Sequence, residues 1–109
     1  MITLIEQHRE QIAELCRRYG VERLDVFGSV TTDKFDETTS DIDLIARFSR
    51  MNEPGIARRF VDFADRMEQL LNRPIDLLTD QPFRNPYFAQ SVARSRKMVY
   101  DRDFTEAAV

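Results

Sequence analysis

The feature that most restricts the fold is a long amphipathic segment between two short apolar ones. Residues 54–72 carry apolar side chains three or four positions apart, and Pro54 suits a first helical position, so they predict a helix. Residues 41–48 (DIDLIARF) alternate in polarity, and residues 74–79 (PIDLLT) are apolar, so each predicts a strand. Strands joined through so long a helix pair in parallel, which predicts an α/β crossover.

The remaining segments extend this unit into a small mixed sheet with flanking helices. We predict a helix over 2–19 ending at Gly20, then a strand over 21–27 (VERLDVF). The short link from 21–27 to 41–48 favours antiparallel pairing of those strands. A helix over 86–96, a short strand at 98–100 and a frayed tail after Asp101 complete the expected α/β domain, which spans residues 1–109.

Composition excludes several classes of protein. Hydrophobic residues make up 42% and charged residues 32%, which is typical of a globular chain. The net charge of −3 gives no general attraction to nucleic acid or anionic membrane, and there is no apolar run of about 20 residues. We therefore expect a cytoplasmic protein that neither spans a membrane nor binds nucleic acid directly. The single cysteine, Cys16, lies on an apolar helix stripe and is expected in the core.

Three aspartates interrupt the two strands that flank the long helix. Asp41 and Asp43 are two positions apart, so on a strand they point to one face and repel each other. A divalent cation relieves this repulsion, and carboxylates are ligands that Mg²⁺ prefers. Asp76 lies in an otherwise apolar strand, where a carboxylate is costly unless it is paired or metal-bound. If strand 74–79 lies beside strand 41–48, three carboxylates converge, as in two-metal phosphoryl transfer sites.

A Gly-Ser pair follows the first strand directly. Gly28 lets backbone N–H groups approach phosphate oxygens, and the hydroxyl of Ser29 adds a donor. This pair predicts a phosphate-binding turn. Each signal alone has a simpler explanation: a common turn, a solvated strand start, or, for Asp76, a salt bridge. Their combination on strand ends that can converge favours one site for metal and nucleotide.

The segment FGSVTTDKFDETTSDIDL at 27–44 resembles the nucleotidyltransferase superfamily that includes DNA polymerase β. That pattern is Gly-Ser, about ten residues, then Asp-x-Asp. The segments RPIDLLTD at 73–80 and NPYFAQSVARSRKMVYD at 85–101 are similar to those of minimal nucleotidyltransferases (MNT). These are the antitoxins of HEPN/MNT toxin–antitoxin pairs, and the resemblance covers nearly the whole chain.

The resemblance implies a fold, an activity and a set of residue roles. Gly28 and Ser29 match the family's phosphate-binding pair, and Asp41, Asp43 and Asp76 match its catalytic, Mg²⁺-binding carboxylates. It further implies two Mg²⁺ ions, ATP as substrate, and a HEPN RNase toxin as partner. Members of the family silence such a toxin by transferring AMP to one of its tyrosines.

The chain departs from the family pattern in the segment after Ser29. The spacer 30–40 has eleven residues, and Val30 stands where many relatives have an arginine. A basic phosphate contact is then either absent or supplied from elsewhere, with Lys34, Arg47, Arg96 and Lys97 as candidates. Two alternatives follow: an antitoxin that acts by binding and occluding its toxin, and a small-molecule nucleotidyltransferase. Relatives of the second kind usually carry an additional helical domain, so it ranks last.

Overall fold

The computed structural model describes residues 3–27, 41–80 and 85–105. Four strands form one sheet in the order β3-β2-β1-β4. They are β1 (Val21–Phe27), β2 (Ile42–Phe48), β3 (Ile75–Thr79) and β4 (Lys97–Asp101). β1 pairs antiparallel with β2 and β4, whereas β2 and β3 are parallel. The predicted mixed sheet is confirmed, as is the crossover between its second and third strands.

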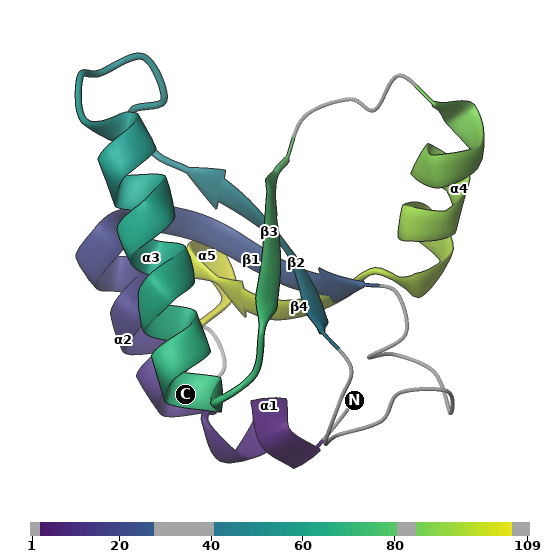
Figure 1. Ribbon diagram of the computed structural model, residues 1–109, viewed down its shortest axis with the longest axis horizontal. Coiled ribbons are helices and arrows are strands. Elements are labelled where there is room, and N and C mark those ends of the chain that lie inside the picture. The colour runs from purple at the N-terminus through teal and green to yellow at the C-terminus, as the bar shows by residue number, and fades with distance from the viewer. Residues whose placement is uncertain (1–2, 28–40, 81–84, 106–109) are drawn as a thin grey trace.

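The helices lie unequally on the two faces of this sheet. They are α1 (Thr3–Gln7), α2 (Arg9–Tyr19), α3 (Ile56–Leu71), α4 (Pro86–Ser95) and α5 (Arg102–Thr105). Residues of α1, α2 and α3 join the main core on one face, while α4 packs on a smaller apolar cluster on the other (Figure 1). The face that carries α4 is therefore covered by fewer of these helices than the face that carries α3, and we call it the open face.

The alternation of β2 decides which side chains occupy each face. Ile42, Leu44, Ala46 and Phe48 are buried in the main core. Phe63 of α3 packs there, with its ring 5.9 Å from that of Phe48 and 6.1 Å from that of Tyr19. The intervening residues of β2, which include Asp43, therefore face the open side.

Three local predictions are wrong. The helix expected over 2–19 is interrupted at His8, whose ring Nδ1 lies 2.9 Å from the carbonyl oxygen of Leu4. The helix expected from Pro54 begins at Ile56, after Gly55 with a left-handed φ of 90°. In the tail expected to fray after Asp101, residues 102–105 form α5, where the Asp101 carboxylate accepts a hydrogen bond from the backbone N–H of Asp103, and residues 106–109 lie outside the described residues.

Cys16 is fully buried, as predicted. Among the helices of the described ranges, none has the length and apolarity needed to cross a bilayer.

Candidate active site

The parallel pairing of β2 and β3 brings two predicted site residues together. Asp43 and Asp76 are Cα partners in this ladder, so their side chains leave the sheet on the same face. Asp41 is exposed and directly precedes β2. Burial raises the pKa of Asp43, and the nearby negative charges of Asp76 and Asp41 raise it further. The three aspartates thus form one electrostatically coupled group, as the sequence predicts.

The chemistry of this donor set fits a hard divalent cation. In the parts of the chain that the structure describes, no three His, Cys, Asp or Glu side chains are already arranged around a metal position. Mg²⁺ does not need such a closed protein cage, because it keeps several waters and binds one or two carboxylates together with substrate phosphates. The pKa of Asp43 is raised first by burial and then by repulsion from Asp76 and Asp41, and a cation would remove that repulsion. The aspartates therefore remain candidates for Mg²⁺ binding.

The predicted phosphate-binding pair, Gly28 and Ser29, lies outside the described residues. The strand that leads to it is described: β1 ends at Phe27, the Cα partner of Asp43. Gly28 is the next residue in the sequence, and the phosphate-binding role of the pair stays a prediction.

A small apolar cluster adjoins the carboxylates on the open face. Phe27, Ile45 and Val92 are buried in it, with Leu78 packed against them. Phe88 of α4 adds an edge-to-face contact with Phe27, with ring centroids 6.2 Å apart. This cluster holds α4 against the sheet next to the site.

From the sequence alone, the aromatic residues Phe83, Tyr87 and Phe88 near two prolines predict either core positions or an apolar patch that docks a partner. Phe83 lies outside the described residues. The side chain of Tyr87 is 82% exposed, so a core position is wrong for it. The docking role stays a prediction.

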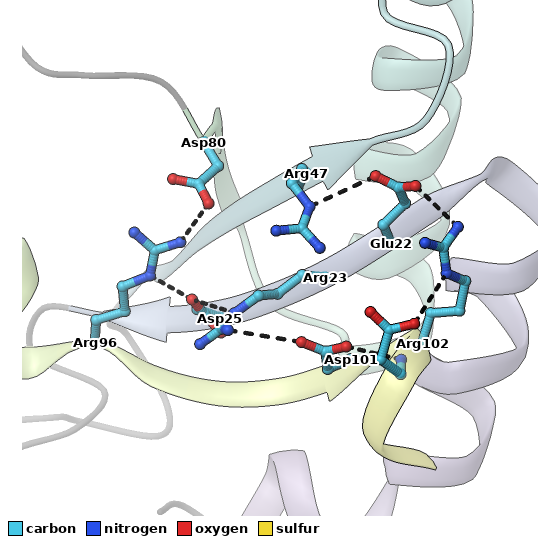
Figure 2. A network of polar contacts seen from close by, with 9 residues as sticks. Glu22, Arg23, Asp25, Arg47, Asp80, Arg96, Asp101 and Arg102 are labelled. Atoms are coloured by element: carbon cyan, nitrogen blue, oxygen red, sulfur yellow. Dashed lines mark hydrogen bonds and ion pairs between the residues drawn. The ribbon is translucent and has the colours of Figure 1, made fainter. Parts of the chain in front are cut away.

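Sequence reasoning missed a charged network on the same face, shown in Figure 2. Asp25 of β1 is 0% exposed, and its carboxylate accepts hydrogen bonds from Arg23 and Arg96. Arg96 also donates to Asp80, and Arg23 lies 3.6 Å from Asp101. The available signal was the position of Asp25 inside an apolar strand, the same argument that identified Asp76.

This network bears on the four proposed sources of a basic phosphate contact. Arg96 is held by two carboxylates, and Arg47 lies 3.5 Å from Glu22. Lys97 is exposed but is the Cα partner of Val26, a main-core residue, so it starts on the face opposite Asp43. Lys34 lies outside the described residues. No described member of the four is both unpaired and on the carboxylate face.

Comparison with known proteins gives consistent results. A Methanocaldococcus jannaschii protein named "Putative protein adenylyltransferase MJ0126" is 27% identical over 89 residues, which is 82% of this chain and 84% of that protein. A solved structure described as a minimal nucleotidyltransferase superposes with a TM-score of 0.64 and 29% identity, covering 84% of this chain and 89% of that one.

A third relative is the MNT antitoxin in a complex with a tri-AMPylated HEPN toxin from Shewanella oneidensis. It superposes with a TM-score of 0.60 at 15% identity, over 95% of this chain and 78% of that one, and so supports the fold alone. The family model of the nucleotidyltransferase domain matches residues 8–99, a range that holds both the Gly-Ser pair and the three aspartates. The chain therefore belongs to the nucleotidyltransferase domain family.

Proposed function

We propose that this protein is an antitoxin that transfers AMP from ATP to a tyrosine of a cognate HEPN RNase toxin and thereby silences it. The observation that carries the proposal is the in-register pairing of Asp43 with Asp76, with the pKa of Asp43 raised by burial and by the neighbouring carboxylates. Support for a protein as the acceptor of AMP comes from two relatives: one is named as a protein adenylyltransferase, and the other was solved in complex with an AMPylated HEPN toxin.

In the proposed reaction, the phenolic oxygen of the toxin tyrosine attacks the α-phosphorus of ATP. The bond from that phosphorus to the pyrophosphate oxygen breaks, and the phenolic proton leaves to water. Asp41, Asp43 and Asp76 would hold two Mg²⁺ ions, and Gly28 and Ser29 would bind the phosphates. Bound there, the ions would neutralise the leaving pyrophosphate and lower the pKa of the attacking hydroxyl.

The direct test is transfer of label from α-³²P-ATP to the protein encoded beside this chain, with Mg²⁺ present. We expect label on the toxin with the wild-type chain and none with the double variant Asp41→Asn, Asp43→Asn. Asp65→Asn is the matched control, because Asp65 is an exposed aspartate on α3, remote from the open face. Equal labelling by the double variant, or none by the wild type, would overturn the proposal.

One observation favours a second candidate, neutralisation of the toxin by binding alone. Val30 replaces a basic residue, and Arg47 and Arg96 are engaged with carboxylates. An antitoxin of this kind would protect RNA from the toxin at a one-to-one ratio, without ATP. RNase assays with and without ATP separate the two candidates, since protection at a small fraction of the toxin concentration requires turnover.

A further inference from the structure

The charged network of Figure 2 centres on Asp25, a carboxylate with no solvent access in an inner strand. Arg23 Nε lies 3.2 and 3.3 Å from its two oxygens. Arg96, which follows Asp25 by 71 positions in the sequence, donates from its Nε to Asp25 Oδ2. A buried carboxylate is tolerated only with such partners, so the sheet depends on at least one of these guanidinium groups.

Arg96 connects Asp25 to a second strand. Its Nη2 lies 2.8 Å from Oδ2 of Asp80, the residue that follows β3. The backbone N–H of Asp80 donates to the carbonyl of Ala46 at 3.0 Å, which extends the β2–β3 ladder by one bond. The backbone N–H of Arg96 also donates to Val92 at the end of α4. A single residue thus joins α4, β1 and the end of β3.

Both carboxylates held by Arg96 lie in, or directly after, strands that build the candidate site. Asp25 lies two residues before Phe27, the Cα partner of Asp43. Asp80 lies four residues after Asp76 along β3. If Arg96 were neutral, the unpaired carboxylate of Asp80 and a less compensated Asp25 would add negative charge to a face that already carries three aspartates. A triphosphate is itself strongly negative, so charge there opposes its approach.

We infer that Arg96 is a positioning residue for nucleotide binding: it neutralises Asp25 and Asp80 and so keeps the open face able to accept a triphosphate. Arg96 acts through these two carboxylates and does not itself contact the nucleotide. The inference rests on the proposed function only in that a nucleoside triphosphate binds beside Asp43 and Asp76.

The test measures the Kd of Mg²⁺·ATP by calorimetry without any toxin, at a temperature where circular dichroism shows each variant folded. We expect Arg96→Gln to raise the Kd by about three- to tenfold in low-salt buffer, where the screening length exceeds the two- to four-residue strand spacing, about 7–13 Å, between the two carboxylates and the site. High salt should shrink the difference. Arg94→Gln is the matched control, because Arg94 is an exposed arginine of α4 two residues before Arg96; it should change the Kd less than about twofold.

Two further variants separate charge balance from structural damage. Asp80→Asn removes one carboxylate and should lower the Kd, the opposite sign to Arg96→Gln. The double variant Arg96→Gln, Asp80→Asn restores the net charge and should return the Kd towards that of the wild type. The inference is overturned if Arg96→Gln lowers only the melting temperature while its Kd is unchanged, or if Asp80→Asn leaves the Kd unchanged or weakens binding.

Failure of the inference can be told from failure of the proposed function. If the wild type binds Mg²⁺·ATP but labels no toxin, the proposed function fails, and the ratio of Kd values still decides the role of Arg96. If the wild type labels the toxin and Arg96→Gln binds Mg²⁺·ATP equally well, only the inference fails. Absence of Mg²⁺·ATP binding by the wild type would overturn both.

Discussion

Replacing Asp43 with asparagine should stabilise the metal-free protein while it abolishes AMP transfer. Asp43 and Asp76 face each other across neighbouring parallel strands, which are about 4.8 Å apart. Two unit charges at about 5 Å repel by roughly 0.8 kcal/mol in water and about 3 kcal/mol at an effective dielectric constant of about 20. Asp76 is exposed, so the lower end applies. We expect a gain of about 1 kcal/mol in unfolding free energy, or roughly 4–8 °C in melting temperature.

The assay is urea unfolding of wild type and Asp43→Asn, first in chelator and then in excess Mg²⁺. In Mg²⁺ the order should reverse, because only the wild type gains binding free energy from the cation. The dependence on pH has a definite sign. The folded-state pKa of Asp43 is raised above its usual 3.8. The contribution of protonated Asp43 to the unfolding free energy is therefore complete below pH 3.8, and it is lost as the pH rises through the raised pKa.

The advantage of Asp43→Asn in chelator should consequently grow over that rise in pH. Asp65→Asn, on α3, should show neither effect. A variant that is less stable than the wild type in chelator, or whose advantage does not depend on pH, would refute the proposed repulsion between the carboxylates.

The remaining predictions concern the core and the helix ends. Phe63→Ala should lower the unfolding free energy by about 3–5 kcal/mol in urea titrations, because the ring is fully buried between two other rings; a loss below about 1 kcal/mol would contradict this packing. Burial raises the pKa of the Cys16 thiol, so alkylating reagents at neutral pH should label it only after unfolding, which mass spectrometry can follow. Gly20→Ala should cost more than Gly55→Ala, although both glycines have positive φ. A Cβ at Gly20 would lie 2.7 Å from Nη1 of Arg59, which donates to three backbone carbonyl groups nearby, whereas at Gly55 nothing lies within 4 Å. The difference should be about 1–3 kcal/mol by thermal unfolding, and equal costs would contradict the contact.

Sequence reasoning placed the carboxylates correctly because their positions follow from local rules. Alternation assigns Asp43 a face, and the long helix after β2 requires a crossover that makes β3 parallel to it. Once the two strands are adjacent, the match of the DIDL and PIDL segments sets Asp43 opposite Asp76. None of these steps needs knowledge of distant contacts.

The Asp25 network could not be predicted in the same way. Asp25 and Arg96 are separated by 71 positions, and nothing local to either residue indicates the other. The irregular register between β1 and β4 at Leu24 and Asp25 also breaks simple alternation. As a result, the adjacent residues Val99 and Tyr100 both enter the main core. Such features depend on long-range pairing, which periodicity does not record.

The pairing of β1 with β4 has a consequence for the order in which the molecule assembles during synthesis. β2 can pair with both β1 and β3 once residue 79 has left the ribosome, and at that stage Asp43 and Asp76 already lie side by side. Arg96, which donates to Asp25 and Asp80, has not yet been synthesised at that stage, and neither has α4. Contacts between residues far apart in the sequence form late, because the chain loses the entropy of closing the intervening loop before the contact contributes any stability. The nascent chain therefore passes through a stage in which its acidic residues are assembled but Asp25 has only Arg23 as a partner, which would delay nucleotide binding until Arg96 is in place.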